Sequence, residues 1–207
     1  AAIPVETPSF TINKLCGSGL KAVTLAAQSI MTGENDIVVA GGTENMSQAP
    51  FLLTTSRWGQ RLGNGQMIDV LLRDGLIDTF DEIHMGMTAE NIVEKYGITR
   101  EEQDKLAVES QNRVQKAIEE GKFKDEIVPL KIPQRRGEPI IFDRDEFPRN
   151  NTTMESVSKL RPAFKKDGTV TAANSSGIND GAAAVVVMSR EKAEKLGLLV
   201  HRTVFSE

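Results

Sequence analysis

The sequence has little of the residue types that mark several classes of protein. Its 207 residues include a single cysteine, so an intramolecular disulfide framework is excluded. Only two histidines, His84 and His201, accompany it, which leaves no tight zinc constellation. These absences favour an intracellular, reducing compartment, and we expect a cytoplasmic protein without a metal centre.

Long apolar runs and an excess of positive charge are also missing. No stretch approaches 18 uninterrupted apolar residues, and the opening AAIPVETPSF lacks the pattern of a secretory signal, so we expect a soluble chain without a membrane partner. The formal net charge of −4 argues against a nonspecific nucleic-acid surface. It leaves room for a small basic patch that binds a phosphorylated ligand.

What the sequence does contain begins with a strand–turn–helix pattern. Residues 9–12 (SFTI) predict a strand, residues 13–19 (NKLCGSG) a tight turn, and the apolar stripe from Leu20 a helix that ends before Gly33. Residues 37–40 (IVVA) predict a buried strand of an α/β sheet. If the two strands are parallel neighbours, the segment forms a crossover unit.

The pattern changes between about Met46 and Asp167, where mixed turns, short helices and charged stretches indicate an insertion. Its clearest element is a helix that starts with a capping box of Thr99 and Glu102 and ends at Gly121. We expect the apolar stripe of this helix to face the core, with the charged face exposed; the stripe comprises Leu106, Ser110, Val114, Ala117 and Ile118.

Strand-like sequence returns after Gly168. The segments TVTA (169–172) and AAAVVVM (182–188) predict two buried strands joined by a turn. Ser189 is expected to cap a last helix that Gly197 ends. The residues alone therefore predict an α/β fold.

Cys16 is the first candidate for chemistry. It lies in LCGSG, between the expected strand and helix, where backbone N–H groups and the positive helix end favour a thiolate. The flanking Gly17 and Gly19 leave space for a thioester to approach the backbone. The alternative is a packed core thiol.

Five segments then match the motifs of one family, in order along the chain. They are NKLCGSGLKAV from Asn13, VAGGTENMS from Val39, HMGMTAEN from His84, KLRPAF from Lys159 and GTVTAANSSGINDGAAA from Gly168. Together they resemble the thiolase family, closest to its biosynthetic acetyl-CoA acetyltransferases, over about residues 8–198.

The resemblance implies a layered α/β thiolase-like fold, in which residues 1–45 and 168–207 belong to an N-terminal domain that carries the nucleophile. Residues 46–167 would form an inserted loop domain that covers coenzyme A. The implied reaction joins two acetyl-CoA molecules into acetoacetyl-CoA, or reverses this, through an acyl group on Cys16. Coenzyme A thioesters are then substrates, and no tightly bound cofactor is expected.

The resemblance also assigns binding residues. His84 and Met85 match residues near the acyl pocket, and Leu76 one that lines the pantetheine tunnel. Arg149 and Ser156 match contacts on the adenine side, and Ser176 a contact to the pantetheine amides.

Each of these assignments has a plainer alternative. His84 can cap or buttress a turn, Arg149 can be a solvated surface residue, and Ser176 can serve its turn. The pair Arg135–Arg136 can meet a phosphate or simply be solvated.

The resemblance also implies a dimer or tetramer, since residues 57–63 (RWGQRLG) resemble a segment that pairs dimers. The family's NEAF, GHPxG and second-cysteine CxGGG motifs do not occur in this sequence. These groups supply the acid–base chemistry, so we expect no turnover from the 207 residues alone. Open alternatives are a longer-chain 3-ketoacyl-CoA thiolase, a non-catalytic coenzyme-A-binding or partner module, and a redox or hydrolytic thiol.

Overall fold

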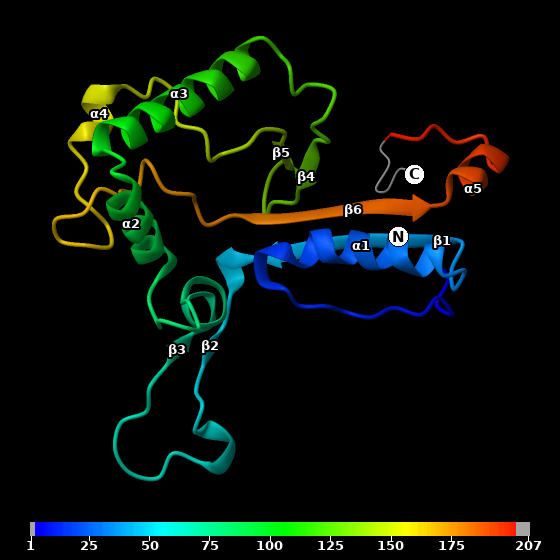
Figure 1. Ribbon diagram of the computed structural model, residues 1–207, viewed down its shortest axis with the longest axis horizontal. Helices are drawn as coiled ribbons and strands as arrows, with labels where there is room; N and C mark the ends of the chain where they lie inside the picture. The colour runs from blue at the N-terminus through cyan, green and yellow to red at the C-terminus, as the bar shows by residue number, and fades with distance from the viewer. Residues whose placement is uncertain (1–2, 202–207) are drawn as a thin grey trace. The chain divides into compact units, whose positions relative to one another are not determined.

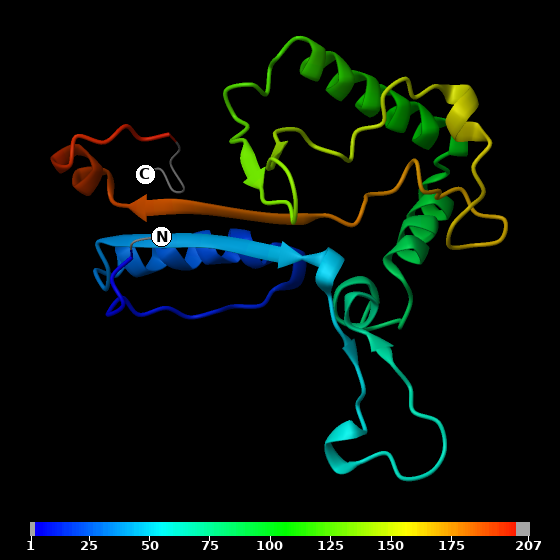
Figure 2. The same cartoon turned by 180° about the vertical axis from the view of Figure 1, so that it is seen from behind.

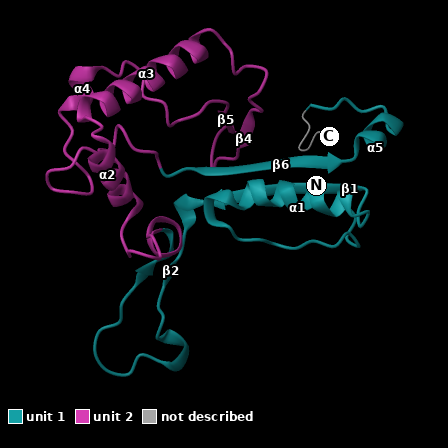
Figure 3. Ribbon diagram, in the orientation of Figure 1, with its two compact units in different colours: residues 1–71, 178–207 teal, residues 72–177 magenta. Residues whose placement is uncertain are grey.

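The computed structural model describes residues 3–201 (Figure 1). The chain divides into two compact units, one of residues 1–71 and 178–207 and the other of residues 72–177 (Figure 3). Within the described residues, no helix has the length and apolar character needed to cross a membrane. The domain boundaries expected near 45/46 and 167/168 stay a prediction.

The first unit is built on a long antiparallel strand pair backed by one helix (Figures 1 and 2). The strands β1 (Ile37–Asn45) and β6 (Asp180–Met188) pair along their whole length, and α1 (Ser18–Met31) packs on them. Gly41 is needed for this pairing, because a Cβ there would lie 2.3 Å from the carbonyl oxygen of Ala183. The backbones of the two strands therefore approach more closely than a side chain at this position allows.

Shorter elements complete the first unit. β2 (Phe51–Leu52) pairs with β3 (Ile68–Asp69), and a π-helical turn (Leu71–Leu76) then leads into the second unit. The last helix, α5 (Arg190–Lys195), begins where predicted, since the Ser189 hydroxyl accepts the N–H of Lys192. Gly197 then has the left-handed φ of 65° that ends the helix.

Three expectations about the first unit are wrong. Residues 9–12 form no strand, and β1 pairs with β6 in antiparallel fashion, so the parallel crossover unit is absent from the described chain. A strand needs a hydrogen-bonding neighbour, and residues 9–12 have none. The long strands are also far from fully buried, since the exposed fraction of Val186 is 60%.

Helices are the longest regular elements of the second unit. It comprises α2 (Met85–Tyr96), α3 (Arg100–Glu119), α4 (Met154–Ser158) and a small hairpin of β4 (Leu130–Ile132) and β5 (Ile140–Phe142). The capping box predicted for α3 is confirmed: Thr99 Oγ1 accepts the Glu102 N–H, and Glu102 Oε2 accepts the Thr99 N–H. The predicted end at Gly121 is also confirmed, by its φ of 69°.

The apolar stripe expected to bury α3 does not do so. Leu106 is 69% exposed, and the most buried residue of the helix is Asp104, at 2%. Neighbouring segments are held on α3 mainly by polar side chains, whose partners are backbone groups of those segments. In α3, polar side chains that bond to neighbouring segments therefore mark the face that packs on them, and the apolar spacing does not.

The strand predicted at residues 169–172 is also absent. The backbone N–H groups of Thr169 and Val170 both donate to Glu90 Oε1, at 2.8 Å each. The N–H of Thr171 donates to Asn174 Oδ1 at 2.7 Å. Side chains thus satisfy the donors that a strand would have used, and the segment becomes an ordered loop.

Candidate active site and coenzyme-binding residues

Cys16 lies in a 3₁₀ turn (Leu15–Gly17) directly before α1. Side chains fix this turn on both sides: Asn13 Oδ1 accepts the Leu15 N–H at 2.9 Å, and Ser18 Oγ accepts the Lys14 N–H at 2.8 Å. Leu15 itself has a φ of 48°, a region that residues other than glycine enter at a cost. The turn is held in a strained, defined shape around the cysteine.

The thiol of Cys16 is exposed, so it is not the packed core thiol that was the alternative. Gly17 is the N-cap of α1 and provides no side-chain hydrogen bond to the first turn. Backbone N–H groups at such a helix end have no acceptor within the helix and attract negative charge. The Gly17 and Ser18 N–H groups donate to the Lys14 and Leu15 carbonyls of the 3₁₀ turn. An exposed nucleophile directly before the positive end of a helix suits attack on a carbonyl whose oxygen becomes negative.

His84 begins α2 in the second unit. Its Nδ1 accepts the Gly86 N–H at 2.9 Å, so a neutral ring carries its proton on Nε2. The ring stacks on Phe164 with centroids 4.7 Å apart. The plainer expectation for His84, that it caps a turn, is therefore confirmed, and the acyl-pocket assignment stays a prediction.

Leu76 and Met85 lie on either side of a short antiparallel bridge that joins Ile77 to His84. The bridge sets residues 76 and 85 next to each other in register, and Leu76 is half-buried. Three of the predicted binding residues therefore gather at the start of α2: Leu76, His84 and Met85.

Arg149 lies on the segment that leads into α4, and Ser156 lies within α4. The Arg149 N–H donates to Gln111 Oε1 at 2.8 Å, which ties the backbone of this exposed residue to α3. The Ser156 hydroxyl donates to the Thr153 carbonyl at 2.7 Å and also accepts the Thr153 N–H at 3.1 Å. Since its proton is used within the cap, Ser156 Oγ can meet a ligand only as an acceptor.

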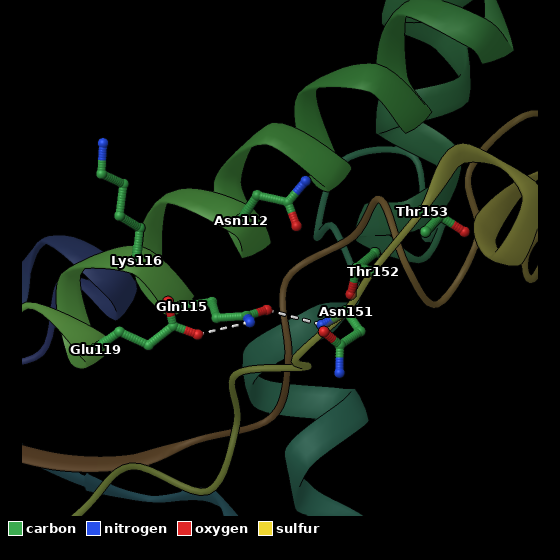
Figure 4. A pocket seen from close by; sticks show the side chains of 7 residues that line it. All are labelled: Asn112, Gln115, Lys116, Glu119, Asn151, Thr152 and Thr153. Atoms are coloured by element: carbon green, nitrogen blue, oxygen red, sulfur yellow. Dashed lines mark hydrogen bonds between the residues drawn. The ribbon is translucent and has the colours of Figure 1, made fainter.

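Beside this segment is an open hollow of about 390 Å³ (Figure 4). Its residues come from the second half of α3 and from the stretch before α4; they are Asn112, Gln115, Lys116, Glu119 and residues 151–153. Figure 4 shows the Gln115 amide between two partners: its oxygen accepts the Asn151 N–H at 2.8 Å, and its nitrogen donates to Glu119. Sequence reasoning missed Gln111 and Gln115, although their spacing of four residues puts both on one helix face.

Ser176 is exposed at the end of the loop that Glu90 and Asn174 organise. Glu90 is only 3% exposed, and such burial alone raises the pKa of a carboxyl group. Hydrogen bonds from the Val170 and Thr169 N–H groups and the Thr169 hydroxyl outweigh the burial, with help from Lys165, and the pKa of Glu90 falls below its usual value. A charged, fully bonded carboxylate therefore anchors the loop.

The predicted residues divide between the two units. Cys16 belongs to residues 1–71, and the six predicted binding residues belong to residues 72–177. In the part of the chain that the structure describes, no three His, Cys, Asp or Glu side chains gather as metal ligands.

Comparison with known proteins gives a consistent result. The family model described as "Thiolase, N-terminal domain" matches residues 1–191. A curated relative from Staphylococcus aureus (strain NCTC 8325 / PS 47), "Probable acetyl-CoA acyltransferase", is 59% identical over 196 residues, which are 95% of this chain and 50% of the relative. The chain thus spans about half the length of that relative.

Solved structures give the same picture. The Bacillus anthracis acetyl-CoA acetyltransferase is similar with a TM-score of 0.83 and 49% identity, over 92% of this chain and 48% of that one. The acetyl-CoA acetyltransferase from Syntrophomonas wolfei is similar with a TM-score of 0.90 and 48% identity, over 96% of this chain and 49% of that one. The predicted α/β, thiolase-like fold is confirmed.

Proposed function

This chain belongs to the thiolase family, and on that premise we propose that it carries the nucleophile half of an acetyl-CoA C-acetyltransferase. The reaction condenses two acetyl-CoA molecules to acetoacetyl-CoA, or runs in reverse, with the acyl group carried on Cys16. The observation behind the proposal is the exposed Cys16 thiol directly before the N-terminus of α1. The names of the similar proteins support the same reaction class.

The first step, transfer of the acetyl group to the enzyme, uses the Cys16 thiol and the N-terminal end of α1. The Cys16 thiol gives up its proton to solvent, its sulfur attacks the thioester carbonyl, and the positive N-terminal end of α1 stabilises the negative oxygen. The carbon–sulfur bond to coenzyme A then breaks, and the coenzyme leaves as a thiolate that takes up a proton. The acetyl group remains on Cys16 as a new thioester.

The second step, carbon–carbon bond formation, removes a proton from the methyl group of a second acetyl-CoA. That proton is very weakly acidic, so a positioned base and an oxyanion site are required. The sequence has no second cysteine to act as the base. We therefore assign acyl transfer to this chain and expect no condensation from it alone.

Coenzyme A would be bound as a substrate by the six residues of the second unit. The neutral His84 ring offers an Nε2 proton, which suits a carbonyl oxygen of the acyl end. Leu76 and Met85 offer apolar surface beside it, and Ser176 is exposed to meet a pantetheine amide. Arg149 offers an exposed positive charge and Ser156 an acceptor on the adenine side.

A longer-chain 3-ketoacyl-CoA thiolase is the second candidate. It is favoured by the broader word in the name of the 59% identical relative, acyltransferase. Rates of Cys16 acylation with acetyl-CoA and with decanoyl-CoA separate the two candidates.

We also propose that the protein forms a homo-oligomer and is located in the cytoplasm.

Mass spectrometry tests the first step. The purified chain, incubated with acetyl-CoA, should gain one acetyl group, and peptide mapping should assign it to Cys16. Cys16→Ser should gain none at that position, and acetyl groups on surface lysines provide an internal measure of nonspecific transfer. Acetylation of the wild type only on lysines would contradict the proposal.

A further inference from the structure

One face of α3 carries a stripe of polar side chains that bond to other segments. Arg100, Asp104, Gln111 and Gln115 are spaced by 4, 7 and 4 residues, so they lie along a single face of the helix. Every one of the four reaches a group outside α3. We refer to these four residues as the polar stripe.

Arg100 connects α3 to the end of α4. Its Nε donates to Asp104 Oδ2 at 2.7 Å, and its Nη2 donates to the carbonyl oxygens of Val157 and Leu160 at 2.9 and 3.1 Å. The planar guanidinium thus bonds a buried carboxylate through Nε and two backbone carbonyls through Nη2, a fixed fork that the single nitrogen of a lysine does not provide. α4 carries Ser156, so Arg100 sets where this serine lies on α3.

Asp104 connects α3 to the loop that ends at Ser176. Its Oδ1 accepts Asn174 Nδ2 at 3.0 Å, and the same Asn174 nitrogen donates to the Thr169 carbonyl at 3.1 Å. Asn174 Oδ1 in turn accepts the Thr171 N–H. One asparagine, held by one buried carboxylate, therefore defines the loop immediately before Ser176.

Gln111 and Gln115 connect α3 to the segment that carries Arg149. Their side-chain oxygens accept the N–H groups of Arg149 and Asn151, at 2.8 Å each. Asn151 has a φ of 59°, an unusual conformation that these bonds help to hold. Two glutamines one helical turn apart therefore fix the backbone of the segment at two points, Arg149 and Asn151.

We infer that the polar stripe is a positioning scaffold that fixes Arg149, Ser156 and Ser176 relative to one another for coenzyme A. The inference rests on the proposed function, which assigns those three residues to the ligand. Apolar contacts allow neighbouring segments to slide, whereas directional hydrogen bonds to backbone groups set one register. The loop before Ser176 and the stretch that carries Arg149 and Ser156 are separate parts of the second unit, and both are attached to α3.

If the polar stripe acts as a scaffold, its variants should affect binding of coenzyme A and of pantetheine differently. Gln111→Ala frees only the Arg149 segment, so it should weaken binding of coenzyme A about tenfold and leave binding of pantetheine unchanged. Asn174→Ala frees only the loop before Ser176, so it should weaken both ligands. Gln111→Glu keeps an acceptor for the Arg149 N–H and should restore coenzyme A binding.

Titrations of the 207-residue chain with coenzyme A and with pantetheine, followed by NMR, measure these affinities. Amide hydrogen exchange without ligand, at Arg149 and Asn174, reports whether each segment is loosened. Arg113→Lys is the matched control, because Arg113 pairs with Glu109 on an exposed part of the same helix. It should change neither affinity. Arg100→Lys extends the test to Ser156, and if it does not fold, the Gln111 variants still decide.

The outcomes separate the two proposals. If the wild type binds no coenzyme A at millimolar concentration, the coenzyme site in the proposed function fails and the scaffold with it. If the wild type binds and Gln111→Ala loosens the Arg149 segment without weakening coenzyme A, only the scaffold is overturned. Equal weakening of coenzyme A and pantetheine by Gln111→Ala, without rescue by Gln111→Glu, would also overturn it, since loss of stability alone gives that result.

Discussion

Glu90 is the residue whose charge state matters most for the second unit. Its carboxylate is buried and accepts bonds from two backbone N–H groups and one hydroxyl. Burial raises its pKa, but those hydrogen bonds and the charge of Lys165 lower the pKa by more. The pKa of Glu90 in the folded protein therefore lies below the ordinary 4.5. Folding therefore favours the charged form. The resulting stability is fully present above about pH 4.5 and disappears as the pH falls through the folded pKa.

The Glu90→Gln variant tests this linkage. We expect it to melt at a lower temperature than the wild type at pH 7, and the difference should shrink as the pH falls below 4.5. Thermal unfolding followed by circular dichroism from pH 7 to pH 3 measures it. Glu94→Gln is the control, because Glu94 is an exposed carboxylate of the same helix that meets only Lys165. A constant difference between wild type and Glu90→Gln across this range would contradict the assignment.

At the scale of elements, the packing of α2 depends on a glycine, Gly86. A Cβ at Gly86 would lie 2.2 Å from Cγ of Phe164, whose ring stacks on His84. Inside a helix, alanine is usually better than glycine by about 1 kcal/mol. Here the clash with an aromatic ring should reverse that preference.

We expect Gly86→Ala to lower the free energy of unfolding by about 2 kcal/mol, the size of a typical overpacking defect. Urea unfolding measures the loss. Gly75→Ala serves as the control, since a Cβ at Gly75 meets nothing within 4 Å. It should be nearly neutral. A stabilised Gly86→Ala would mean that Phe164 moves away without cost.

The elements also show where sequence reasoning succeeds. The caps at Thr99 and Ser189 are predictable because each is completed within four residues of sequence. The identity of the partner strand of β1 and the absence of a strand at residues 169–172 are not, because they depend on groups far away in the sequence. Glu90, for example, takes up N–H groups 79 and 80 residues further along the chain.

The same limit applies to the candidate site. Its residues were named by the order of five motifs, and Cys16 also by its place before a helix. The polar stripe was missed because its spacing also fits an ordinary solvated helix face. Only the backbone partners of Gln111 and Gln115 distinguish the two.

At the scale of the whole molecule, apolar side chains remain exposed in both units. Trp58, the single tryptophan, is 86% exposed within the segment expected to pair dimers. Exposed aromatic and aliphatic groups of this kind commonly mark contact surfaces. We expect the chain to self-associate at micromolar concentration through residues 57–63.

Light scattering and Trp58 fluorescence test this together. Scattering mass should rise with concentration while the emission of Trp58 shifts to shorter wavelength, since association removes water from the indole. Trp58→Ala should reduce the scattering mass, and Phe80→Ala, at another highly exposed aromatic residue outside this segment, should not. A monomer at all concentrations, with unshifted emission, would count against the expectation.

The way Glu90 holds residues 169–172 has a consequence for how the protein fails. The sequence TVTA is strand-forming by composition, and in the structure the Glu90 carboxylate takes two of its N–H groups while Asn174 takes that of Thr171. Protonation of Glu90 in acid removes the charge that strengthens these bonds, so we expect the Thr169 and Val170 donors to open more often on a segment with high β propensity. Free strand donors recruit other chains edge to edge, so acid exposure should lead to β-rich aggregates that begin at this loop. We therefore expect the Glu90 carboxylate to protect the protein against aggregation.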